Sequence, residues 1–257
     1  MIKSFKWKTL VREIIRRRFL IGSVFVLGFC LIIGIRIVFS DRIERWKKGI
    51  TEFSSLNTPL KGYLHDMCSK DPGPNCTCVA FIHGTGQNAL IWKKLLFASP
   101  EEWRHQGVED PLKILAVDLP GASVASKLPQ KNLQELRKQA EMLRTGLSGL
   151  CPRWVLVGQE SGGWIAAWLA LDWPEGVKRL ILMAGLQGEL QMGLIQVPTL
   201  LLWGKDDAVV PITTGYQIRE SMHSAIWREA TGGHFLQNEN PDAVMQSIRD
   251  MLNFGSM

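Results

Sequence analysis

The stretch 154–167 constrains the fold of this chain more than any other. It begins with Trp-Val-Leu-Val, an apolar run rich in β-branched residues, which predicts a buried strand. Gly158, Gly162 and Gly163 follow, and the small and apolar residues Trp-Ile-Ala-Ala come directly after them. Glycines allow a strained turn with close backbone packing on both sides. The stretch therefore predicts a strand, a tight turn and a helix in immediate succession.

The remainder of the chain after residue 60 repeats this alternation of strands and helices. Apolar runs typical of buried strands alternate with segments in which apolar residues recur at helical spacing. The expected strands are 62–65 (at a sheet edge), 77–82, 112–118, 177–183, 199–203 and 225–229, and the expected helices are 92–97, 133–147, 211–222 and 241–252. We therefore predict one α/β domain over 61–257, with a mostly parallel central sheet and helices on both faces.

The first 60 residues have a different character. Residues 1–18 are basic, and residues 19–39 are almost wholly apolar. At about 1.5 Å per residue, this apolar run spans roughly 30 Å, the thickness of a bilayer core. We expect 19–39 to form one transmembrane helix and 40–60 to form a charged juxtamembrane helix or linker. A cleavable signal peptide is the main alternative. A buried soluble helix fits less well, because the run is apolar on every face.

The positive charge of the chain belongs to its N-terminus. The first 48 residues contain 12 Lys/Arg and three Asp/Glu, a net charge of +9, whereas the whole chain has +6 and the remainder therefore −3. We accordingly expect no nucleic-acid partner for the domain. Seven Lys/Arg precede the span and four follow it closely. This difference predicts a cytoplasmic N-terminus and a periplasmic or otherwise extracytoplasmic domain.

Four cysteines lie outside the apolar span: Cys68, Cys76, Cys78 and Cys151. This even number is compatible with two disulfides in an oxidising compartment, with the connectivity left open. A zinc site that combines cysteines with a histidine is disfavoured, because the Cys-x-Cys spacing matches zinc-binding loops poorly. We therefore expect neither a metal nor an organic cofactor.

Four motifs of the domain resemble those of the α/β-hydrolase family. They are His83-Gly84-Thr85-Gly86, Val117-Asp118-Leu119-Pro120-Gly121, Leu202-Trp203-Gly204-Lys205-Asp206-Asp207-Ala208-Val209-Val210-Pro211 and Gly232-Gly233-His234-Phe235. The resemblance implies that Asp207 is the acid and His234 the general base of a catalytic triad. It also implies that the N–H groups of Thr85 and Ser161 form an oxyanion hole. The short connection 184–197, where the family often inserts a lid, predicts a fold without a lid domain.

The sequence departs from the family at the nucleophile. Gly158-Gln159-Glu160-Ser161-Gly162 matches the pattern Gly-x-nucleophile-x-Gly, with Glu160 in place of the nucleophilic serine. In a first interpretation the site is inactive in acyl transfer. In a second, the turn shifts by one residue and Ser161 is the nucleophile. In a third, Glu160 attacks as a carboxylate, as Asp does in haloalkane dehalogenases and epoxide hydrolases. Glutamate is one methylene longer, however, and those enzymes carry a lid.

We favour the first interpretation. It describes a membrane-anchored α/β-hydrolase-fold protein with a degenerate triad, acting as a non-catalytic accessory or structural subunit of a membrane complex. The alternative is a serine hydrolase of the esterase or lipase type that acts on small apolar esters through Ser161, His234 and Asp207.

Overall fold

The computed structural model describes residues 44–45, 48–68, 76–120, 133–185, 192–222 and 224–254. The chain divides into two compact units, Met1–Lys47 and Lys48–Met257, and the strands and helices named below all belong to the second. The expected transmembrane helix at 19–39 lies outside the described residues. Within the part that is described, no helix is both long enough and apolar enough to span a bilayer.

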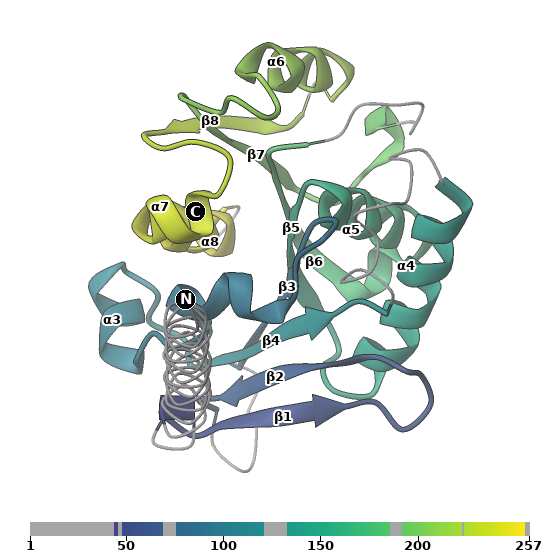
Figure 1. The fold of residues 1–257 in the computed structure, drawn as a ribbon, viewed down its shortest axis with the longest axis vertical. Helices are drawn as coiled ribbons and strands as arrows, with labels where there is room; N and C mark the ends of the chain where they lie inside the picture. The colour runs from purple at the N-terminus through teal and green to yellow at the C-terminus, as the bar shows by residue number, and fades with distance from the viewer. Residues whose placement is uncertain are drawn as a thin grey trace, which may run out of the picture. The chain divides into compact units, whose positions relative to one another are not determined.

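A sheet of eight strands forms the centre of the second unit (Figure 1). In spatial order the strands are β1 (Ile50–Ser54), β2 (Lys61–Asp66), β4 (Leu112–Asp118), β3 (Thr77–Ile82), β5 (Trp154–Gln159), β6 (Val177–Met183), β7 (Thr199–Gly204) and β8 (Ile226–Ala230). The pairs β1–β2 and β2–β4 are antiparallel, and every other pair is parallel. The prediction of a mostly parallel sheet is confirmed. All residues of β3, β5 and β7 are buried, as expected for strands covered on both faces.

Helices cover both faces of this sheet (Figure 1). On one face, α4 (Leu133–Ser148), α5 (Ser161–Asp172) and α6 (Ile212–Ser221) contribute to one hydrophobic cluster. On the other face, η1 (Ala89–Trp92), α2 (Lys93–Leu96), α3 (Pro100–His105), α7 (Leu236–Glu239) and α8 (Pro241–Asn253) contribute to a second. The sheet therefore separates two apolar layers, and the loops at its ends are left to carry polar side chains.

The start of the domain differs from our expectation. Residues 50–54, which we placed in a linker, form the edge strand β1, and the compact unit begins at Lys48. Consequently β2 is an internal strand rather than an edge strand. The physical reason is that β1 buries fully only Ile50, so its apolar signal is weak. Its place in the fold is fixed by backbone pairing with β2.

Short helices account for most of the other differences. The expected helix 92–97 corresponds to α2 within one residue at each end, but the 3₁₀ turn η1 that precedes it and the helices α3 and α7 were not expected. A capping box starts α3: the hydroxyl of Ser99 accepts the Glu102 N–H, and the Glu102 carboxylate accepts the Ser99 N–H. The other expected strands and helices agree with the structure within about one residue at each end. They are 77–82, 112–118, 133–147, 177–183, 199–203, 211–222, 225–229 and 241–252.

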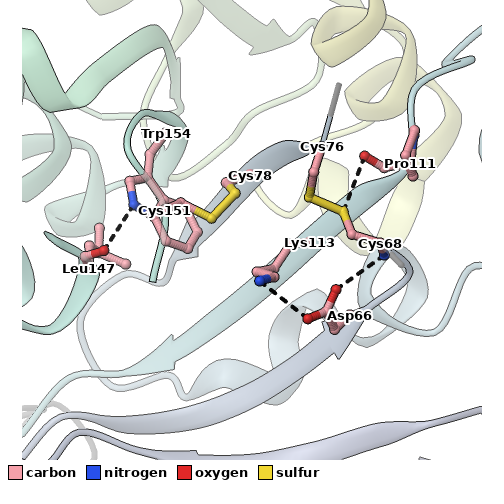
Figure 2. Close-up of a disulfide and its surroundings, with 9 residues drawn as sticks. All are labelled: Asp66, Cys68, Cys76, Cys78, Pro111, Lys113, Leu147, Cys151 and Trp154. Atoms are coloured by element: carbon pink, nitrogen blue, oxygen red, sulfur yellow. Dashed lines mark hydrogen bonds and ion pairs between the residues drawn. A yellow bond between two sulfur atoms is a disulfide. The ribbon is translucent and has the colours of Figure 1, made fainter. Parts of the chain in front are cut away.

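The four cysteines form two disulfides, Cys68–Cys76 and Cys78–Cys151 (Figure 2). Cys78 lies in β3, and Cys151 precedes β5, so the second bond links β3 to the segment that leads into the adjacent strand β5. Beside it, the indole N–H of Trp154 donates to the carbonyl of Leu147 at 3.2 Å. The structure thus pairs the cysteines, a point that the sequence left open.

Candidate functional site

Glu160 forms the sharp turn between β5 and α5. Its backbone has φ 52° and ψ −121°, a combination that a residue with a side chain adopts only under strain. A β-carbon at Gly158 would lie 2.5 Å from the Gly162 carbonyl oxygen, and one at Gly162 would lie 2.3 Å from that of Ile82. The two glycines are therefore required by close backbone packing. The turn has its apex at Glu160, and Ser161 is the first residue of α5.

Asp207 and His234 come together as the sequence predicts. Asp207 follows β7, His234 lies between β8 and α7, and Nδ1 of His234 is 3.0 Å from Oδ2 and 3.2 Å from Oδ1 of Asp207. Oδ1 of Asp207 also accepts the N–H groups of Val209 and Val210. Burial alone would raise the pKa of Asp207. The hydrogen bonds from His234 and from these two N–H groups, together with the charge of His234, have the larger combined effect, so the pKa of Asp207 lies below its usual value. The carboxylate therefore orients the imidazole.

The other ring nitrogen of His234 contacts Gln159, a residue that sequence reasoning missed. Nε2 of Gln159 lies 3.1 Å from Nε2 of His234 and 3.4 Å from the His234 carbonyl oxygen. Gln159 is fully buried at the last position of β5. With the amide in this orientation, the Gln159 NH₂ donates to Nε2 of His234, and the ring proton that faces Asp207 lies on Nδ1. The available signal was a polar residue at the end of an otherwise apolar strand.

The carboxylate of Glu160 occupies the neighbourhood of the expected oxyanion hole. The backbone N–H of Thr85 hydrogen-bonds this carboxylate, and Oε2 lies 2.5 Å from the point where a β-carbon of Gly84 would be. Burial raises the pKa of Glu160, while the charge of His234 and the Thr85 N–H lower it less, so the pKa lies above its usual value. The donor expected to stabilise an oxyanion therefore interacts with a side chain of the protein itself.

Ser161 interacts with Thr85 rather than with the imidazole. The hydroxyl of Thr85 donates to Oγ of Ser161 at 2.9 Å. The hydrogen bonds of the His234 ring go to Asp207 and Gln159. The structure thus brings together two groups of residues, Asp207 with His234 and Gln159, and Thr85 with Ser161 and Glu160. The electrostatic interaction of Glu160 with His234 connects them.

His83 links the turn that follows β3 to the end of β4. Its Nδ1 is 2.8 Å from the Gly84 carbonyl oxygen, and its Nε2 accepts the Leu119 N–H at 3.2 Å. Burial lowers the pKa of His83, which favours the neutral ring that these bonds need. A cavity of about 320 Å³ lies on this side and is lined in part by Tyr63, His83 and Asp118. In the described part of the chain, no cluster of His, Cys, Asp and Glu is arranged to hold a metal ion.

The strand order, the strained turn at Glu160 and the Asp207–His234 pair define an α/β-hydrolase fold, and comparison with solved structures bears this out. A predicted CIB-like hydrolase from Thermoplasma acidophilum superposes with a TM-score of 0.63 at 22% identity, covering 79% of this chain and 97% of that one. A membrane phospholipase A, described as a novel bacterial virulence factor, superposes with a TM-score of 0.63 at 22% identity. This match covers 92% of this chain and 98% of that one. The protein is thus an α/β-hydrolase-fold protein, as the resemblance implied.

Comparison by sequence gives matches over only part of the chain. No family model matches the chain. The biotin biosynthesis bifunctional protein BioHC of Teredinibacter turnerae is 29% identical over 114 residues. This match covers 44% of the chain but only 18% of that protein, so the chain spans less than a fifth of the length of this curated relative.

Proposed function

We propose that this protein is a non-catalytic α/β-hydrolase-fold subunit that a transmembrane helix at 19–39 anchors in a membrane complex. One observation carries the proposal: the apex of the elbow holds Glu160, and the carboxylate of this residue is hydrogen-bonded to the Thr85 N–H. A serine hydrolase needs a hydroxyl at this apex and an unoccupied pair of N–H donors beside it. The site has a carboxylate in place of the hydroxyl, and one of the two expected donors, the Thr85 N–H, already interacts with that carboxylate.

The imidazole supports the same proposal. A general base must reach the nucleophile with its Nε2 lone pair. In this site Nε2 of His234 accepts from the Gln159 amide, and Oγ of Ser161 is bonded to Thr85. An acyl-transfer reaction would have to break both of these contacts before Ser161 lost its proton to His234.

The membrane and compartment parts of the proposal rest on sequence and disulfides. Residues 19–39 are long and apolar enough for one span, and the excess of Lys/Arg before them favours a cytoplasmic N-terminus. The two disulfides favour an oxidising compartment for the domain, because such bonds rarely persist in a reducing cytosol. We therefore place the domain on the extracytoplasmic side of the membrane.

Fluorophosphonate labelling of the full-length protein in detergent tests this proposal. We expect no adduct on Ser161 in a sample shown to be folded by circular dichroism, and co-purification of a membrane protein after mild solubilisation. A stoichiometric adduct on Ser161 that disappears in His234→Ala would overturn the proposal. An adduct on Glu160 after incubation with an alkyl halide or an epoxide would instead favour the carboxylate-nucleophile interpretation.

A serine hydrolase on small apolar esters remains the second candidate. The assembled Asp207–His234 pair favours it, because this is the acid–base part of a triad. Several structural neighbours are also described as hydrolases, for example an esterase from Rhodococcus. Hydrolysis of p-nitrophenyl butyrate by the wild-type protein, reduced at least about 100-fold in both Ser161→Ala and His234→Ala, would establish this candidate. Equal background rates in all three proteins would exclude it.

A further inference from the structure

We propose that Gln159 couples Glu160 to the His234–Asp207 pair, and that Glu160 is a carboxylic acid whose proton is donated to Oε1 of Gln159. The proposal assigns a positioning role to Gln159, which lies outside the family triad. It concerns bonding inside the site and holds whether or not the protein has a membrane partner.

The first observation is an unsatisfied acceptor. Gln159 is fully buried, and within the described residues its Oε1 has no hydrogen-bond partner. An unpaired buried polar atom lowers the stability of the folded state, so native structures normally supply a partner. The side-chain nitrogen of the same amide is already directed at His234. A donor is therefore missing on the opposite side of the Gln159 amide.

The second observation is the position of the Glu160 carboxyl group. Oε2 of Glu160 and Oε1 of Gln159 lie 2.5 Å and 3.0 Å from one point, the place where a β-carbon of Gly84 would be. An ionised carboxylate is only an acceptor and would face the amide oxygen with like partial charge. A protonated carboxyl group has the O–H donor that Oε1 lacks. Gly84, which has no side chain, leaves room for the two groups to meet.

With a proton on Glu160, the side chains of the site form a series of hydrogen bonds in which each residue donates to the next. Glu160 donates to Gln159, Gln159 donates through Nε2 to His234, and His234 donates through Nδ1 to Asp207. The Thr85 N–H donates to the Glu160 carboxyl group. Burial raises the pKa of Glu160, which favours the protonated carboxyl group, and in this arrangement the ring of His234 is neutral and carries no charge to oppose it.

The opposite arrangement has the same net charge and makes the proposal falsifiable. If Glu160 were ionised and His234 protonated, the Gln159 amide would turn over. Its NH₂ would then donate to Glu160, and its oxygen would accept from Nε2–H of His234. The two arrangements differ in the orientation of the Gln159 amide and in the position of one proton, which is on Glu160 in the first and on Nε2 of His234 in the second.

Nitrogen NMR of the ¹⁵N-histidine-labelled full-length protein in detergent micelles distinguishes the two arrangements. The His234 signals are assigned from their loss in His234→Gln. At neutral pH we expect Nδ1 of His234 to carry a proton and Nε2 to carry none. We also expect a pH-dependent step in the Nε2 shift when Glu160 ionises, and the loss of this step in Gln159→Leu. A protonated Nε2 at neutral pH, or an unchanged step in Gln159→Leu, would overturn the proposal.

Infrared spectroscopy gives a second test that does not require Gln159→Leu to fold. We expect a protonated-carboxyl C=O band in the wild-type protein at neutral pH and its absence in Glu160→Gln. The glutamine variant is the matched control, because its NH₂ can donate to Oε1 of Gln159 in place of the acid. Its His234 nitrogen shifts should therefore equal those of the wild-type protein. An identical carboxyl band in both proteins would contradict a protonated Glu160.

Discussion

The side-chain nitrogen of Gln159 lies 3.1 Å from Nε2 of His234, on the side of the imidazole opposite Asp207. Both ring nitrogens of this histidine therefore interact with buried side chains of the protein. In an active triad one of them would face the nucleophile.

Glu160→Gln should make the protein more stable at neutral pH. Burial raises the pKa of Glu160 above its ordinary value of 4.5, so the folded state holds this proton more tightly than the unfolded state. The resulting stabilisation is fully present below pH 4.5 and is lost as pH rises through the folded-state pKa. Melting temperatures measured between pH 4 and pH 8 should show an advantage of the glutamine variant that grows with pH. A constant difference across this range would contradict the prediction.

Gly84→Ala should destabilise the protein through Glu160. The added methyl group would lie 2.5 Å from Oε2 and 2.9 Å from Cβ of Glu160, and overpacking of this kind costs about 1–3 kcal/mol. Glu160→Gly removes both atoms, so the double variant should recover most of the loss in thermal unfolding. Gly162→Ala is the matched control, because its methyl group would meet the backbone oxygen of Ile82 at 2.3 Å. Glu160→Gly should not rescue that variant.

Glu160→Ser should create a reactive residue at the apex of the elbow. The hydroxyl would stand where the family places its nucleophile, and the loss of the carboxylate would free the Thr85 N–H. We expect a fluorophosphonate adduct at position 160 that disappears in Glu160→Ser combined with His234→Ala. Because Gln159 engages the base, we also expect labelling to rise at least several-fold in Glu160→Ser combined with Gln159→Leu. Unreactive but folded variants would show that more than the nucleophile is missing.

The two disulfides should contribute unequally to stability. Cys78–Cys151 joins residues 73 positions apart and Cys68–Cys76 joins residues eight apart. Loop-closure entropy then predicts losses of about 4 and about 2.5 kcal/mol in the respective double serine variants. Thermal unfolding of both variants, each compared with the wild-type protein with and without reductant, checks this order. Equal losses would point to strain or packing rather than chain entropy.

Stability should fall at acidic pH through His83. Burial lowers the pKa of His83, so the folded state resists its protonation, and its contribution is lost as pH falls below the ordinary value of about 6.5. A protonated ring could not accept the Leu119 N–H. His83→Gln should show a shallower fall in melting temperature between pH 7.5 and pH 5. The remaining fall is expected from His65, whose pKa burial also lowers. A fall as steep as that of the wild-type protein would count against this role.

The sequence was most informative where burial is complete. Every residue of β3, β5 and β7 is buried, so their apolar runs predicted all three strands, and the ends of β3 and β7 were correct within about one residue. The edge strand β1 was not predicted, because it exists by pairing with β2 and fully buries a single side chain. Likewise, α3 and α7 are too short to show helical periodicity.

In the site, too, some contacts could be predicted from the sequence and others could not. Asp207 and His234 stand in motifs with fixed spacing to a strand end, and their contact was predictable from the family pattern. The partner of Nε2 of His234 was not, because it depends on the direction of one amide at the end of β5. A polar residue beside a glycine-rich turn resembles any other turn residue in sequence. Only the packed structure shows that Gln159 is fully buried and faces the imidazole.

The bond between Cys78 and Cys151 also determines what happens if the backbone is cut. The segment between the two cysteines includes β4 and α4, and a protease that cleaves it leaves both fragments in one covalent molecule. Such a nicked protein would migrate as an intact chain until a reductant released the fragments. The strand β3 would stay tethered to β5 and to the elbow at Glu160. The domain can therefore be cut within this segment and still remain a single covalent molecule as long as the Cys78–Cys151 bond is intact.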